Sequence, residues 1–175
     1  MSYTELYAIK KDVAIKKEFK NAFRGAMYVW NDIAKRYAGF EYFPMNHEDQ
    51  MEVWNYHYRH PNVMKEHEAI VMLSTMDNAM VEANQWERLV NAFEQYGLEH
   101  PNSNYYDQAN AIKELVEQEG IDNIVGFAWN QTSINGVPWF VTEEYVEELD
   151  DYVDHIYNPD ESSIHFWVFE QWDME

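Results

Sequence analysis

Cysteine is absent from this 175-residue chain, which excludes both a disulfide framework and a thiolate metal site. No stretch approaches the roughly 20 consecutive apolar residues that a membrane-spanning helix needs. The first residues, MSYTELYAIKKDV, contain no apolar run of the kind that a secretion signal requires. We therefore expect a cytoplasmic protein with no membrane partner.

Basic residues are scarce and unevenly distributed. The chain has 12 Lys and Arg against 32 Asp and Glu, which gives a formal net charge of −20. Eight of the basic residues lie in a basic N-terminal segment, residues 1–36, whereas the strongly acidic C-terminal third, residues 114–175, has sixteen acids and no Lys or Arg. Because self-repulsion on this scale destabilises a compact protein, we expect some other advantage to offset this cost.

Apolar and aromatic residues are abundant, at 46% and 17% of the chain. Disordered acidic tails combine high net charge with low hydrophobicity, so this composition predicts a packed core instead. The chain has no repeats and no linker-like stretch, which favours a single domain over residues 1–175.

The apolar pattern predicts helices and strands that do not alternate regularly. Spacings of three and four predict helices over residues 19–37, 48–58, 85–96, 105–119 and 143–156. Gly39 is the expected stop of the first helix and Gly97 that of the third. Short apolar or alternating runs predict strands over residues 3–9, 69–73, 79–82, 124–129 and 164–169, the last one central in the sheet. The lysine pairs at residues 10–11 and 16–17 flank either a turn or a second short strand. A helix is the competing interpretation of residues 69–73, and Asn135-Gly136 is typical of a hairpin turn. The fold class that follows is α+β, with about five helices packed on a mixed or antiparallel sheet.

The stretch from Glu143 to Asp154 holds seven carboxylates and no basic residue. With Thr142 as its N-cap, we expect this stretch to be a helix whose Glu143, Glu147 and Asp151 form one column of negative charge. Seven charges on about 18 Å of helix correspond to roughly one charge per 2.6 Å, against about one per 1.7 Å in duplex DNA. The helix could therefore occupy a DNA-binding groove, although a solvated helix face that aids solubility is the alternative. The expected partner-binding residues are Glu143, Glu144, Glu147, Glu148, Asp150, Asp151 and Asp154, with Trp139 and Trp172 as aromatic anchors.

His57 and His60 are the candidate metal ligands, because they are three residues apart on a helix with His47, Glu66, His67 and Glu68 nearby in sequence. Arg59 between them and Pro61 directly after them oppose such a site. The chain also has no phosphate-binding glycine loop, nucleophile elbow or cysteine nucleophile. We therefore expect no metal, cofactor or catalytic residue, while Ser74–Asp77 and Trp129–Thr132 are the places where a small-molecule pocket could form.

The lysine-rich N-terminal segment could be a nucleic-acid footprint, but the rest of the chain would repel phosphate. The interpretation that we favour is that these lysines pair with the acidic region, either within the fold or across a homo-oligomer interface.

Three stretches, FRGAMYVWNDIAKRY (residues 23–37), LSTMDNAMV (residues 73–81) and AWNQTS (residues 128–133), resemble stretches in small acidic proteins of tailed bacteriophages. The similarity covers about a quarter of the chain. It implies a phage accessory protein made in the host cytoplasm, and it transfers no site residue.

These observations lead to the hypothesis of a phage-encoded, non-enzymatic inhibitor. As an acidic DNA mimic, it would occupy the DNA-binding surface of a host DNA-binding or defence protein. The alternative is an acidic protein-interaction or assembly module unrelated to DNA. A metal-dependent enzyme or a small-molecule binder is the third possibility.

Overall fold

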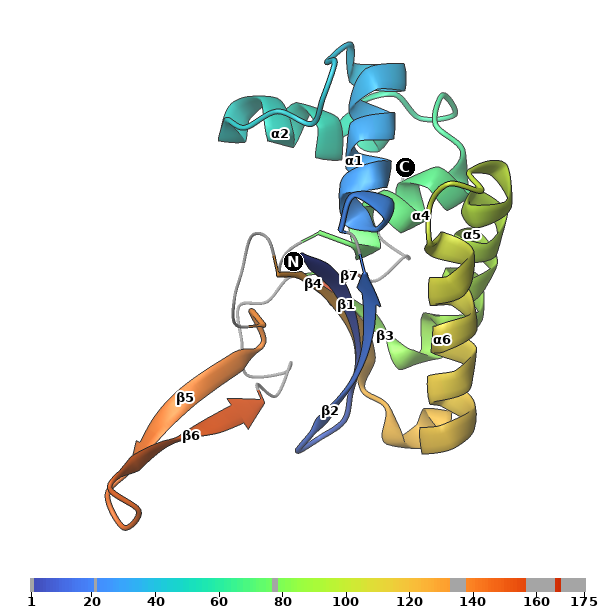
Figure 1. Ribbon diagram of the computed structural model, residues 1–175. Helices are drawn as coiled ribbons and strands as arrows, with labels where there is room; N and C mark the ends of the chain where they lie inside the picture. The colour runs from blue at the N-terminus through green and yellow to red at the C-terminus, as the bar shows by residue number, and fades with distance from the viewer. Residues whose placement is uncertain (1, 21, 77–78, 133–137, 157–165, 168–175) are drawn as a thin grey trace.

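The computed structural model describes residues 2–20, 22–76, 79–132, 138–156 and 166–167 (Figure 1). Its main sheet has the strand order β2-β1-β4-β3-β7, antiparallel throughout except that β3 and β7 run parallel. A second sheet consists of β5 and β6 alone. The strands are β1 Tyr3–Ile9, β2 Ala14–Lys20, β3 Met80–Glu82, β4 Gly126–Gln131, β5 Val141–Val146, β6 Asp151–Ile156 and β7 Phe166–Trp167.

Five helices of eight or more residues lie in the described part of the chain, so the predicted α+β class is confirmed. The helices are α1 Ala26–Ile33, α2 His47–Trp54, α3 Tyr56–Arg59, α4 Glu66–Ser74, α5 Trp86–Glu99 and α6 Tyr105–Glu119, with a π-helical turn at Ala34–Ala38 and short 3₁₀ turns at Ala22–Arg24, Ala83–Gln85 and Ile121–Asn123. Among the described helices, none is both long and apolar enough to span a bilayer.

The two faces of the main sheet are covered by different parts of the chain. Alternate residues such as Leu6, Phe127 and Trp129 join the core that the helices form. The residues between them, such as Tyr7 and Ala128, belong to a smaller apolar cluster centred on the fully buried Phe140, which directly precedes β5. The helices therefore cover one face of the sheet (Figure 1), and the cluster around Phe140 lies on the other face.

Residues 69–73 are helical, so their prediction as a strand is wrong and the competing interpretation is correct. They lie in α4, where eight of nine residues are buried. A helix that is buried on every side has no polar face, and its apolar run therefore lacks the periodicity that distinguishes a helix from a strand.

The helix predicted over residues 19–37 begins later, at Ala26, because residues up to Lys20 belong to β2. Phe19 pairs with Thr4 of β1, and this sheet pairing overrides the helical spacing. The predicted stop at Gly39 is confirmed by its left-handed backbone, with φ of 77°.

Among the described strands, β7 lies at the edge of the main sheet beside β3, so its predicted central position is wrong. The hairpin signal at Asn135-Gly136 falls outside the described residues.

Gly97 lies inside α5, not at its end, because the helix continues to Glu99. A Cβ atom at Gly97 would collide with the backbone nitrogen of Tyr106 in α6. Glycine is therefore needed here for the close approach of two helices, although the same residue type is also a common helix stop.

We predict that Gly97→Ala lowers the free energy of unfolding by about 1–3 kcal/mol, the usual cost of overpacking a close contact. Helix propensity alone predicts the opposite sign, a gain of up to about 1 kcal/mol. Urea unfolding distinguishes the two, with Gln95→Ala on the exposed side of α5 as a control expected to stay within about 0.5 kcal/mol. An unchanged or raised stability of Gly97→Ala would show that the helices can separate freely.

Candidate functional site

The acidic stretch is a β-hairpin, so the prediction of a helix over residues 143–156 is wrong. Strand β5 pairs antiparallel with β6, and Glu143 lies opposite Asp154 while Tyr145 lies opposite Tyr152. The four residues between the strands, Glu147 to Asp150, form the connecting loop, and Asp150 adopts a left-handed conformation with φ of 51°. Figure 1 shows the hairpin projecting from the side of the main sheet opposite to α5 and α6.

The prediction failed because the residues of this stretch are compatible with both a helix and a β-hairpin. Its Val, Thr, Tyr and Ile residues favour strands, and Asp tolerates the left-handed position that the loop requires. A helix would instead hold its carboxylates at i,i+4 spacing, where each like-charged pair costs a few tenths of a kcal/mol.

The hairpin distributes its charge differently from a helix. The expected column of Glu143, Glu147 and Asp151 does not exist, because Glu147 lies in the loop and Asp151 pairs with Val146, a position on the opposite face of the ribbon from Glu143. The charge density nevertheless remains high, because seven carboxylates on strands about 20 Å long amount to roughly one per 3 Å. The hairpin is thus a narrow ribbon with acidic positions on both faces.

The tip of the hairpin combines exposed acids with exposed apolar side chains. Glu147, Glu148, Asp150 and Asp151 are all exposed. The side chains of Leu149 and Tyr152 are exposed to 65% and 63%, and the rings of Tyr145 and Tyr152 meet edge to face at 5.3 Å. The Tyr145 hydroxyl donates a hydrogen bond to the Asp150 carboxylate, which raises the pKa of Tyr145.

The basic N-terminal segment pairs with other parts of the chain. Lys10 lies 2.8 Å from Glu119 and Lys17 lies 3.4 Å from Glu114, both on α6. Where the structure describes the side chains, no Lys or Arg forms an ion pair with the four acids at the hairpin tip. No described basic side chain therefore neutralises these four acids.

The two predicted aromatic anchors have different outcomes. The Trp139 indole donates a hydrogen bond of 3.2 Å to the Trp129 carbonyl and packs against the cluster around Phe140. It is thus engaged inside the fold, and its contact with a partner stays a prediction. Trp172 lies outside the described residues.

The candidate ligand His57 lies in α3, and His60 directly follows this helix. His60 is exposed, with its ring 4.3 Å from that of Tyr56. His57 is half-buried, and burial lowers its pKa in spite of the nearby charge of Glu66. Neither belongs to a group of three possible metal ligands within the described ranges.

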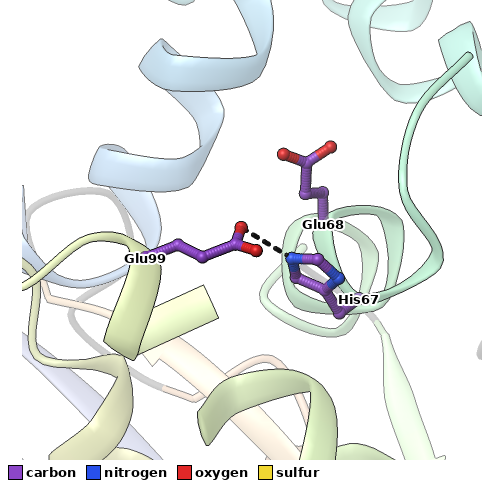
Figure 2. Close-up of side chains that lie close together, drawn as sticks. All are labelled: His67, Glu68 and Glu99. Carbon is purple, nitrogen blue, oxygen red and sulfur yellow. Dashed lines mark hydrogen bonds and ion pairs between the residues drawn. The ribbon is translucent and has the colours of Figure 1, made fainter. Parts of the chain in front are cut away.

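Such a group does form from His67, Glu68 and Glu99, whose ligand atoms lie within 4.8 Å of one another (Figure 2). The His67 Nε2 is 2.9 Å from a Glu99 carboxylate oxygen. Sequence reasoning noted His67 and Glu68 but missed Glu99, since no local pattern relates residues 32 positions apart.

The two carboxylates of this group are already neutralised by protein cations. Glu68, whose side chain is 1% exposed, accepts hydrogen bonds from Arg36 Nη1 at 2.8 Å and from the Tyr37 hydroxyl at 2.6 Å. Lys65 Nζ lies 3.1 Å from Glu99. Because these donors occupy the carboxylates, the group connects α4 to α5 and to the end of the first helix and does not offer an open set of metal ligands.

The same network continues to Asp32, which accepts hydrogen bonds from Arg36 Nε at 2.7 Å and from the Tyr96 hydroxyl at 2.6 Å. Burial alone would raise the pKa values of Asp32 and Glu68, but the hydrogen bonds from Arg36 and the tyrosines outweigh it and the pKa of each carboxyl is lowered. Burial and the Glu68 contact raise the pKa of Tyr37 to about 12. These shifts belong to a network that holds the helices together.

The polar residues that follow two apolar runs have structural partners as well. The Ser74 and Thr75 hydroxyls donate hydrogen bonds to carbonyls of α4, and the Trp30 indole donates to Thr75 at 3.2 Å. Gln131 accepts a hydrogen bond from Thr4 at 2.9 Å. Turn and core contacts thus account for Ser74, Thr75 and the amide oxygen of Gln131, and Asp77 lies outside the described residues.

No protein-family model, curated protein or solved structure matches the chain.

We predict that Glu68→Gln lowers the free energy of unfolding at neutral pH by about 1–3 kcal/mol, because Arg36 and Tyr37 lose a charged acceptor while Arg36 keeps Asp32. The pKa of Glu68 in the folded state lies below its ordinary value of 4.5, so its contribution is present above that value and is lost as pH falls through the folded-state pKa. The difference between wild type and variant should therefore shrink from about pH 5 towards pH 3.

Urea unfolding across this pH range is the measurement, and Glu66→Gln is the control. Glu66 lies in the first turn of the same helix, but it is exposed and pairs with Arg88 at the surface. We expect this control to change stability by no more than about 1 kcal/mol. An equal loss for Glu66→Gln and Glu68→Gln would contradict a special role of the buried pair.

Proposed function

We propose that this chain is a non-enzymatic binding protein that docks its β5–β6 hairpin on a cationic surface of a partner protein. The observation that carries the proposal is the projecting acidic ribbon. Its sixteen residues, Val141–Ile156, hold seven carboxylates and no Lys or Arg, and the four acids at its tip are exposed. Surfaces of one sign steer an oppositely charged partner and raise its association rate.

The exposed apolar side chains at the tip would supply the binding affinity that charge alone does not provide. Surface ion pairs contribute little net affinity, whereas buried aromatic and aliphatic anchors dominate the energy of interfaces. Tyr145, Leu149 and Tyr152 stand beside the acids and would be buried on docking. Charge would thus set the encounter rate, and these three side chains would slow dissociation.

Acidic positions on both faces of the ribbon favour a groove over a flat surface as the docking site. A groove with basic walls meets both faces at once. Such grooves accept DNA, whose charge density of about one per 1.7 Å is within a factor of two of the hairpin's roughly one per 3 Å. Together with the resemblance to small phage proteins, this supports a host DNA-binding or defence protein as the partner and inhibition by DNA mimicry as the mechanism.

The second candidate is an interaction or assembly module whose basic partner does not bind DNA. The apolar tip favours it, because a pure mimic of the phosphate backbone needs no exposed Leu149. Competition separates the two: duplex DNA displaces a mimic from its partner and leaves an assembly contact unaffected.

The first test is affinity capture from bacterial host lysate at low salt and at about 0.5 M salt, where screening shortens the range of electrostatic forces to a few ångströms. The proposal expects a protein that is retained at low salt, lost at high salt and displaced by duplex DNA. If a protein is retained but duplex DNA does not displace it, DNA mimicry is wrong and docking on a basic partner stands. If no basic protein is retained at low salt, docking itself is wrong.

We predict that neutralising the tip by Glu147→Gln, Glu148→Gln, Asp150→Asn and Asp151→Asn weakens binding to the captured partner at least tenfold and flattens its salt dependence. Asn also tolerates the left-handed conformation at position 150. The matched control removes four exposed acids elsewhere, by Glu41→Gln, Glu52→Gln, Glu117→Gln and Asp122→Asn. This control has the same total charge as the tip variant, but its substitutions lie outside the hairpin. Titration calorimetry should therefore find that it binds the partner within about threefold of wild type. Equal weakening of both variants would assign the effect to net charge alone.

A further inference from the structure

Strand β2 forms an open edge of the main sheet, because β1 is its neighbour and no other described strand pairs with it. The direction of its backbone groups follows from two hydrogen bonds. Lys10 N–H donates to the Val13 carbonyl at 2.8 Å, and Thr132 N–H donates to the Tyr3 carbonyl at 3.1 Å. Residue pairs across an antiparallel ladder alternate between hydrogen-bonded and non-hydrogen-bonded pairs. Counted from either of these two hydrogen bonds, Lys16, Glu18 and Lys20 belong to non-hydrogen-bonded pairs with β1. Their N–H and C=O groups therefore point away from β1.

This edge is strongly basic. Residues Lys10–Lys20 contain five lysines and two acids. Lys11 and Lys20 are exposed, and neither forms an ion pair with a described side chain. Edge lysines prevent identical strands from pairing, since like charges would meet. An acidic strand would meet no such barrier.

We propose that the β2 edge binds the β5–β6 hairpin of a second copy of this chain. The hairpin is the acidic element of the fold that carries unpaired strand edges, since its two strands form a sheet of their own in the described part of the chain. The lengths also match, because six-residue strands span about 20 Å and the seven residues of β2 about 23 Å. Main-chain hydrogen bonds to the open edge would provide affinity, and opposite charges would provide register and selectivity.

The assembly is a closed dimer if the hairpin of each copy binds the β2 edge of the other copy. Two such contacts related by a two-fold axis make a dimer and leave no free β2 edge from which a filament could grow. The dimer would also cover the hairpin, so self-association would compete with docking on a foreign partner. The purified chain alone tests this inference, and its outcome does not depend on whether such a partner exists.

A charge-swap experiment separates the proposal from general electrostatic effects. The edge variant carries Lys11→Glu and Lys20→Glu, which break no ion pair between described side chains. The hairpin variant carries Glu148→Lys and Asp151→Lys at exposed positions. Each variant alone weakens the charge complementarity of both contacts. In the mixed dimer, one contact has the wild-type charges on both sides, and in the other contact the new glutamates of the edge face a hairpin that carries the new lysines.

Sedimentation velocity at low ionic strength should find a dimer for wild type, monomers for each variant alone and a mixed dimer when the variants are combined. Salt at about 0.5 M should weaken the wild-type dimer at least tenfold. The control, Lys35→Glu with Arg59→Glu, makes the same charge change at exposed positions away from β2 and should dimerise like wild type. Circular dichroism verifies that each variant is folded.

Amide hydrogen exchange gives an independent result for the wild-type chain. The outward N–H groups of Lys16, Glu18 and Lys20 should exchange at least tenfold more slowly at concentrations where the dimer forms than in the dilute monomer. A wild-type chain that stays monomeric at low ionic strength, or variants that fail to associate when mixed, would overturn the proposal. An equally impaired control would overturn it too.

Discussion

The helical layer depends on the neutralisation of one buried carboxylate, that of Glu68. This residue lies in the first turn of α4, a helix buried on nearly every side, and its side chain is almost inaccessible to water. An unpaired charge in such a place costs several kcal/mol, so Arg36 and Tyr37 must reach it from the turn that follows α1. Arg36 also binds Asp32, and Tyr96 of α5 binds Asp32 in turn. The need to neutralise the Glu68 carboxylate therefore helps to determine how α1, α4 and α5 pack together.

This use of cations inside the body has a consequence for the surface. Seven of the twelve Lys and Arg residues form ion pairs between described side chains of the sheet and helices. The hairpin contains no basic residue and projects from the body (Figure 1). The acidic excess of the chain is thus most concentrated on a thin element that a partner can reach from several sides, and the proposed docking builds on this separation.

Prediction from sequence succeeded for helix α6, whose range Tyr105–Glu119 is as predicted because one face is buried and the other is exposed. It also succeeded for β1, residues 3–9, although both faces of this strand are buried. It was wrong for the acidic stretch because Tyr145, Val146, Leu149, Tyr152 and Val153 fit a helical stripe equally well. In the hairpin the same spacing places Tyr145 opposite Tyr152 across a four-residue loop. Gly97 was misread for a related reason, since a glycine that ends a helix and one that admits a neighbouring helix look alike in one dimension.

The amino-acid sequence by itself determined the α+β composition, the absence of thiol chemistry and the division of charge between a basic start and an acidic end. These properties follow from residue types and short-range periodicity, which need no knowledge of distant contacts. Only the tertiary structure decided that the acids lie on a ribbon instead of a helix, that Glu99 meets His67, and that β2 forms an open edge. Such features depend on which segments pair across long stretches of chain, and the free energy of that pairing outweighs the local preferences that a sequence displays.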